Sequence, residues 1–261
     1  MDKIRSGFKQ ITHSNTFTGK LGFIIIAILI YVVVVKIGIM ILSWALTSSQ
    51  TVLISGMRPA KEMIIFPQNP NLSGSKPVFR SVNQEDGIEF TWSIWMFIDN
   101  LEYNQGKYRC VFYKGNNNIG DNGINEPNNA PGLYISPNTN ELIVFMNTFN
   151  IINEKVNIPD IPINKWMNVI IRCNGKKLDI YMNGMIIRSI VLQGVPKQNY
   201  GDVYVSANGG FDGYISNFVY YNKALSIDEI QKILGRGPNL SMDTSSLRSK
   251  DMTYLSMKWY N

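Results

Sequence analysis

The chain has 261 residues, of which 45% are hydrophobic and 17% are charged, and its formal net charge is +6. Residues 1–46 hold five basic side chains and one acidic side chain, so residues 47–261 are nearly neutral at +2, which argues against a nucleic-acid-binding surface on this larger part. Two cysteines, Cys110 and Cys173, are too few for a disulfide scaffold. The one histidine, His13, leaves no His-based triad or His-rich metal site for residues 47–261.

A basic tail, residues 1–20, precedes a long apolar run over residues 21–46. The run exceeds the length of about 20 residues that crosses a bilayer core, so we expect a membrane-spanning helix and a lipid bilayer as partner. A buried helix of a soluble domain and a signal peptide, whose apolar region is only about 7–15 residues long, are the alternatives. The anchor residues of the expected span include Leu21, Ile30, Lys36 and Trp44.

Lys36 is the one charged residue of the run, and the run contains no acidic partner for it. A proton or ion relay needs such a partner, so we expect Lys36 to snorkel or to face another helix of an assembly. The basic residues of the tail favour a single-pass protein whose N-terminus lies on the cytosolic side.

Residues 47–76 are rich in glycine, proline and serine and are predicted to be a linker. Residues 77–261 form a strand-like segment of about 185 residues, the size of one domain. Within it, residues 90–98 alternate strictly, which predicts a strand with a dry inner face and a partly covered outer face. The inner face comprises Phe90, Trp92, Ile94, Met96 and Ile98.

Two Asn-Gly pairs give the clearest local signal. Asn174-Gly175 and Asn183-Gly184 separate three strand-like segments, and Asn-Gly supplies the positive φ that both central positions of a tight hairpin need. They predict a three-stranded antiparallel meander. Further strands are expected over residues 107–115, 132–136, 141–149, 202–206 and 213–221.

One short helix follows the strands. Ser226 and Glu229 form a capping-box pattern, an apolar stripe comes next, and Gly235 is expected to end the helix. The C-terminal tail is apolar enough that we expect it to dock on the domain. Many short strands with one short helix predict an all-β, antiparallel β-sandwich that follows a single transmembrane helix.

Four motifs in a fixed order carry a family resemblance. They are EFTWSIWMFID (89–99), YKG (113–115), NKWMNVIIRCNGKKLDIYMNG (164–184) and GGFDGYISNFVYYNKALSIDEI (209–230). Over residues 81–234 the chain resembles the concanavalin A-like lectin/glucanase superfamily in its laminin-G and pentraxin-like branch, which implies a jelly-roll sandwich. The Asn-rich style and the ending GPNLS…YLSMKWY also resemble membrane-anchored lectin-like proteins of large DNA viruses. That resemblance implies a place in the internal membrane of a virion and structural proteins, such as capsid proteins, as partners.

The glucanases of this superfamily resemble one another in a Glu-x-Asp-x-x-Glu run along one strand, which supplies a nucleophile and an acid. The nearest run here, Glu85-Asp86-Gly87-Ile88-Glu89, has different spacing. In a strand Glu85 and Glu89 would share a face while Asp86 points away. We therefore expect a polar loop that leads into a strand, and no catalytic residues.

Lectin-like relatives often bind Ca²⁺ through loop oxygens, and Asp121 and Asp212 are the metal candidates here. The loop spacing matches no calcium motif, so no cofactor is expected and Ca²⁺ remains the alternative. For the cysteines, buried free thiols are expected, with a Cys110–Cys173 bond as the alternative. Tyr134, Trp166 and Tyr181 are aromatic candidates for stacking on sugars, with packing in the core as the alternative. Glycosylation sequons begin at Asn71 and Asn239.

Three function classes follow. The first is a non-catalytic structural protein, such as a viral minor capsid protein that links a membrane to a shell. The second is a glycan-binding surface lectin, and the third, a glucanase, is disfavoured by the missing carboxylates.

Overall fold

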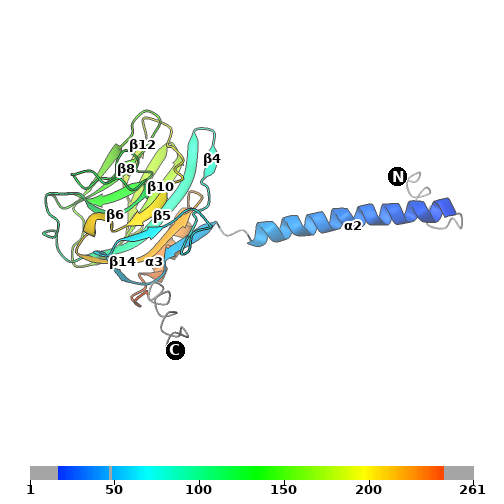
Figure 1. Ribbon diagram of the computed structural model, residues 1–261, viewed down its shortest axis with the longest axis horizontal. Helices are drawn as coiled ribbons and strands as arrows, with labels where there is room; N and C mark the ends of the chain where they lie inside the picture. The colour runs from blue at the N-terminus through cyan, green and yellow to red at the C-terminus, as the bar shows by residue number, and fades with distance from the viewer. Residues whose placement is uncertain (1–16, 47–48, 244–261) are drawn as a thin grey trace, which may run out of the picture. The chain divides into compact units, whose positions relative to one another are not determined.

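A computed structural model describes residues 17–46 and 49–243, and the chain divides into two compact units, residues 1–48 and 49–261. The first unit contains helix α2 (Phe17–Leu46), shown in blue in Figure 1. Residues 20–42 are long and apolar enough to cross a membrane, and their side chains are not buried by the protein. Helix α2 begins at Phe17, four residues before the start of the apolar run, so its first turn lies within the predicted basic tail.

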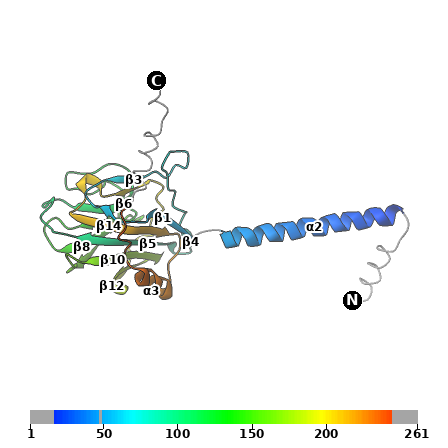
Figure 2. The ribbon, with the colours of Figure 1, turned by 90° about the horizontal axis from the view of Figure 1, so that it is seen from below.

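The second unit is an antiparallel β-sandwich of two sheets, as predicted (Figures 1 and 2). The first sheet has the order β1-β14-β5-β10-β11-β12, with β2 beside β14 and β4 beside β5. Its strands are β1 (Gln50–Ile54), β2 (Arg58–Pro59), β4 (Val82–Gln84), β5 (Gly87–Ile98), β10 (Trp166–Gly175), β11 (Lys177–Met182), β12 (Met185–Val191) and β14 (Gly213–Tyr221). The second sheet has the order β3-β13-β6-β7-β8-β9. Its strands are β3 (Ile64–Phe66), β6 (Arg109–Gly115), β7 (Gly132–Ile135), β8 (Glu141–Met146), β9 (Glu154–Pro159) and β13 (Asp202–Val205).

Aromatic side chains pack at the centre of the core between the sheets. The ring of Trp92 on β5 lies 5.2 Å from that of Phe112 on β6 and 5.5 Å from that of Phe218 on β14. All three side chains are fully buried, so this cluster joins the two sheets. The predicted inner face of β5 is confirmed. On its outer face Thr91, Ser93 and Trp95 are buried and Phe97 is half-buried, so this face is covered more fully than predicted.

The linker predicted over residues 47–76 requires correction, because residues 49–66 belong to the sandwich. Strand β1 pairs with β14, and β3 pairs with β13. Leu53, Ile54 and Phe66 are buried, and the hydrophobic free energy of this burial offsets the conformational entropy that these short strands lose on folding. The glycines and prolines around the strands hid their apolar pattern in the sequence.

The C-terminal tail lies mostly outside the described residues. At its start, the backbone of residues 241–243 pairs with Met57: Met57 N donates to Ser241 O, and Asp243 N donates to Met57 O. The apolar tail residues that were expected to dock, Tyr254 to Tyr260, are not among the described residues.

The meander of β10, β11 and β12 is confirmed, but its two turns differ. In the second turn, Asn183 and Gly184 have φ of 48° and 79°, the pattern of a type I′ turn, and Met182 pairs with Met185. In the first turn, Asn174 pairs with Lys177, so the loop is Gly175-Lys176. Only Gly175 has positive φ there, at 64°, which fits a type II′ turn and corrects the prediction for Asn174.

Helix α3 (Ile227–Arg236) has the predicted capping box, since the Ser226 hydroxyl accepts from Glu229 N and the Glu229 carboxylate accepts from Ser226 N. The helix continues past Gly235, and Gly237, with φ of 68°, caps it instead. Ile230 packs with Ile170, Tyr181 and Leu225, so α3 covers part of the outer face of the first sheet. A 3₁₀ turn, η1 (Ala207–Gly209), follows β13.

Candidate functional site

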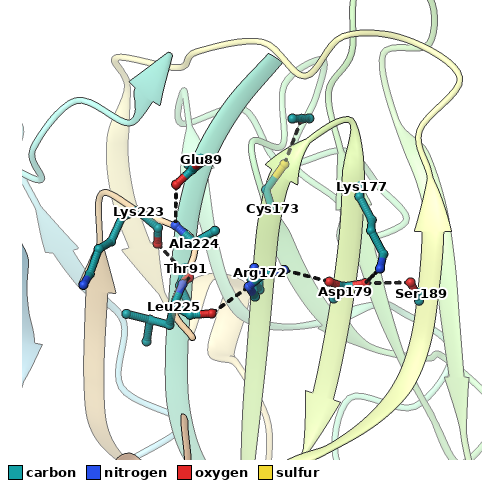
Figure 3. A network of polar contacts seen from close by, with 11 residues as sticks. Glu89, Thr91, Arg172, Cys173, Lys177, Asp179, Ser189, Lys223, Ala224 and Leu225 are labelled. Carbon is teal, nitrogen blue, oxygen red and sulfur yellow. Dashed lines mark hydrogen bonds and ion pairs between the residues drawn. The ribbon is translucent and has the colours of Figure 1, made fainter. Parts of the chain in front are cut away.

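A buried polar network lies on the outer face of the first sheet (Figure 3). Asp179 on β11 is only 1% exposed. It accepts a hydrogen bond of 2.9 Å from Arg172 Nη1 on β10 and one of 2.6 Å from the Ser189 hydroxyl on β12. Lys177 Nζ lies 3.6 Å from the same carboxylate. Paired and hydrogen-bonded in this way, the charge of Asp179 is held in place rather than offered to a substrate.

The network also fastens the segment that leads into α3. Arg172 Nε donates to Leu225 O at 2.8 Å. The Thr91 hydroxyl donates to Lys223 O at 2.8 Å and accepts from Leu225 N at 3.0 Å. Glu89 accepts from Ala224 N at 3.1 Å, so four side-chain contacts tie this segment to strands β5 and β10 (Figure 3). These contacts give the network a structural role.

The two acids of the glucanase-like run therefore have different environments. Glu89 is engaged by Ala224 N and by the Gln84 amide. Glu85 lies in the exposed turn between β4 and β5, so it does not share a strand face with Glu89 as an all-strand segment would require. Glu89 is thus held by contacts within the sandwich, whereas Glu85 is exposed in a turn.

The two metal candidates lie in different loops. Asp121 is exposed in the Asn-rich loop of residues 116–131. Asp212 precedes β14, forms an ion pair of 2.6 Å with Lys61 Nζ and accepts from Asn100 Nδ2. The hydrogen bond from Lys61 lowers the pKa of Asp212, so this carboxylate already has a cationic partner. Among the residues that the structure describes, no group of three or more His, Cys, Asp or Glu side chains is placed to hold a metal ion.

The Asn-rich loop instead covers the outer face of the second sheet. Asn125 and Asn129 are fully buried there. The Tyr134 hydroxyl donates to Asn129 Oδ1 at 2.7 Å and accepts from Asn125 N at 3.2 Å. The Tyr134 ring is parallel to that of Tyr113, which in turn stacks on Tyr204 at 4.8 Å. The loop thereby seals an aromatic layer against the sheet, and Tyr134 has no face open to a sugar.

The other aromatic candidates are not brought together. Tyr181 is buried under α3, and burial raises its pKa. Trp166 at the start of β10 is half-buried, with its ring 5.7 Å from that of Phe97. Cys110 and Cys173 are free and buried, and desolvation raises the pKa of each thiol to about 12, so neither is a nucleophile near neutral pH.

The anchor candidates lie on α2. Leu21, Ile30 and Lys36 have exposed side chains, while Trp44 belongs to the part of the helix whose side chains are not described. An unburied apolar surface of this length suits contact with lipid. A signal sequence near an N-terminus has the same features.

A cleft of about 520 Å³, which no pattern in the sequence predicted, lies at one end of the second sheet. The loop after β3 and the segment before β13 form its walls, and Lys114 at the end of β6 lies at its base. Lys114 is 5% exposed, and its Nζ donates to Gly201 O at 2.7 Å and to Gln68 Oε1 at 3.3 Å. Burial lowers the pKa of Lys114 to about 8. A lysine at the end of the otherwise apolar segment CVFY was the available sequence signal.

The rim of the cleft is polar with one exposed aromatic ring. Arg80 and Tyr200 are exposed there, Tyr200 by 70% of its surface. Asp202 Oδ1 accepts from Gln68 N at 2.8 Å. Gln198 Oε1 is buried without a hydrogen-bond partner, which is costly unless a ligand or water supplies a donor.

Comparison with known proteins places the fold. The family profile for laminin G-type domains of the concanavalin A-like lectin/glucanases superfamily matches residues 75–231, more than half of the chain. No curated protein sequence matches the chain.

Among solved structures, the receptor-binding domain of botulinum neurotoxin D is similar at 17% identity, covering 70% of this chain and 43% of that one, with a TM-score of 0.48. The serotype D ligand-binding domain in complex with N-acetylneuraminic acid is similar at 16% identity, covering 69% and 41%, with a TM-score of 0.49. The binding domain of botulinum neurotoxin DC in complex with rat synaptotagmin II is similar at 19% identity, covering 57% and 35%, with a TM-score of 0.43. This chain spans less than half of the length of each of these structures.

Proposed function

Because the chain belongs to the concanavalin A-like lectin/glucanases superfamily, we propose that it is a non-catalytic binding module held at a membrane by helix α2. The observation that carries the proposal is α2 itself, an apolar helix of 30 residues ahead of a complete sandwich. Its N-terminus faces the cytosol or the interior of a particle, according to the basic residues before the span.

The absence of catalysis is part of the same proposal. Asp179 and Glu89 are engaged in the polar network, and Glu85 stands apart from them in a turn. A glycosidase needs two carboxyl groups about 5–10 Å apart on opposite sides of one bond, with room for a sugar between them. The contacts of the sandwich acids support packing rather than that chemistry.

The partner in this proposal is a structural protein, and the setting is the internal membrane of a virion. The resemblance of the Asn-rich segments and of the C-terminal ending to membrane-anchored proteins of large DNA viruses supports it. In that role the sandwich links the bilayer to the shell as a minor capsid protein.

The test is to locate the protein in purified particles and to cross-link it there. The proposal predicts recovery with the particle membrane and cross-links from the sandwich to a structural protein of the particle. The double substitution Glu85→Gln and Glu89→Gln should leave assembly unchanged, because an amide oxygen still accepts from Ala224 N. Absence from particles, or hydrolysis of β-glucans that this double substitution stops, would contradict the proposal.

Glycan binding is the second candidate function, and the cleft above Lys114 favours it. Exposed Tyr200 and the polar atoms around it are the mixture of apolar and hydrogen-bonding surface that small-ligand sites use. A glycan array separates the candidates: selective binding of one class of saccharide supports the second, and binding of none supports the first.

A further inference from the structure

The charge of the cleft is the first clue to its ligand. Arg80 is exposed on the rim, and no hydrogen-bond or ion-pair partner reaches it from any residue that the structure describes. Lys114 adds a positive charge at the base, and Asp202 adds one negative charge. Lys197, which lies next to the cleft, directs its ammonium toward the ring of Phe149, 5.0 Å away. The three charged side chains that line the cleft, Arg80, Lys114 and Asp202, thus sum to +1, which matches a ligand with a single carboxylate.

The hydrogen-bonding groups are the second clue. Lys114 Nζ has three N–H groups and uses two of them, on Gly201 O and Gln68 Oε1. Gln198 Oε1 is a buried acceptor that lacks a donor. A ligand hydroxyl group can accept from the remaining N–H of Lys114, and a ligand hydroxyl can also donate to Gln198 Oε1. Hydroxyl groups on neighbouring ligand atoms would therefore satisfy both side chains.

The third clue is the ring of Tyr200, which is 70% exposed on the rim of the same cleft. An open aromatic face contacts the apolar C–H surface of a pyranose while its hydroxyls reach the polar groups below. A cleft of about 520 Å³ is within the size range of small-ligand sites.

We propose that this cleft binds an acidic saccharide that carries one carboxylate, with Arg80 on the carboxylate, Lys114 and Gln198 on the hydroxyls and Tyr200 against the sugar ring. This proposal rests on the second candidate function, glycan binding, and specifies both its site and its ligand class.

Isothermal titration of the full-length protein in nonionic detergent tests the proposal. The probes are glucuronate and N-acetylneuraminate as acidic saccharides, glucose as the neutral counterpart of glucuronate, and acetate as a carboxylate without a sugar. The acidic saccharides should bind at least about tenfold more tightly than glucose and acetate. A factor of about ten in Kd is what one charge-assisted hydrogen bond contributes. Arg80→Gln should remove the preference for glucuronate over glucose. Tyr200→Ala should weaken both sugars by the same factor, because Tyr200 contacts the ring.

Arg188→Gln is the matched control, since Arg188 is an exposed arginine on β12 outside the cleft and should leave all affinities unchanged. If glucuronate and glucose bind equally, or if Arg80→Gln keeps the preference, the ligand class or the site is wrong while glycan binding itself stands. If acetate binds as tightly as the acidic saccharides, the cleft recognises a carboxylate and no sugar, and the proposal fails. If no saccharide binds, both the proposal and the glycan-binding candidate fail.

Discussion

The turn between β11 and β12 makes a stability prediction that the structure allows to be worked out in detail. A Cβ atom on Gly184 would lie 2.1 Å from Leu234 Cδ1 of α3, and Gly184 has φ of 79°. Gly175 has a similar φ of 64°, but the nearest atom to a Cβ there, in Asp86, is 3.8 Å away. An alanine at either glycine would therefore have the same unfavourable positive φ, but only an alanine at position 184 would also clash with α3.

Gly175→Ala should lower the free energy of unfolding by about 1–2 kcal/mol, the cost of an L-residue at positive φ. Gly184→Ala should cost about 0.5–1.5 kcal/mol more, because the half-buried Leu234 side chain must turn away from its present rotamer. At this domain size each kcal/mol lowers the Tm by about 2–4 °C. Thermal unfolding of the full-length protein in detergent, followed by near-UV circular dichroism, measures both variants under the same conditions.

Leu234→Ala provides the double-mutant cycle. Combined with Gly184→Ala it should recover the excess loss, because the clashing methyl group is gone, whereas combined with Gly175→Ala it should be additive. Equal Tm losses for the two glycine variants, or additivity in both cycles, would refute the contact between the turn and α3.

Three further predictions concern buried groups. Asp179→Ala should destabilise the sandwich by about 3–5 kcal/mol in denaturant unfolding, because it leaves the partly buried guanidinium of Arg172 without its carboxylate partner. As a control, Asp228→Ala on the exposed surface of α3 should cost less than about 1 kcal/mol. Lys114 has a pKa of about 8 when folded and 10.5 when unfolded, so the unfolded chain holds more protons between these values. The stability of the protein relative to Lys114→Met should therefore rise with pH from 7 to 9, by up to about 1.4 kcal/mol per pH unit; a flat difference would contradict this. The other titratable groups around the cleft are Arg80, Lys197, Tyr200 and Asp202. Cys110 and Cys173 should resist iodoacetamide at pH 8 until the protein unfolds, and rapid labelling of the folded protein would show that they are not buried.

Local patterns in the sequence predicted the parts of the fold that depend on near neighbours. The alternation over residues 90–98 identified the inner face of β5, because side chains alternate across a strand whatever its partner. The capping box at Ser226 and Glu229 was visible for the same reason, since both of its hydrogen bonds form within four residues.

Features that depend on distant pairing were not visible. Strand β1 is stabilised by β14, which lies more than 160 residues further along the chain, and no local pattern marks that partner. The register of the first hairpin depends on the full ladder of β10 and β11, which shifts the loop by one residue from Asn174 to Gly175.

The candidate site follows the same division. The residue types at Asp121 and Asp212 were legible in the sequence, but the ion pair between Asp212 and Lys61 joins loops about 150 residues apart. The cleft likewise assembles Arg80, Lys114 and Tyr200 from three separate segments, so its charge and shape exist only in the folded chain.

Extraction of isolated membranes with alkaline carbonate, combined with the intact mass of the recovered chain, tests the membrane-anchored binding module most directly. A membrane-anchored protein should stay in the membrane pellet with residues 17–46 still attached, and deletion of residues 1–46 should release a folded sandwich. Release of the intact protein by carbonate would show that α2 does not span the bilayer, and a chain that has lost this segment by cleavage would identify α2 as a signal sequence. Either result would contradict a membrane anchor.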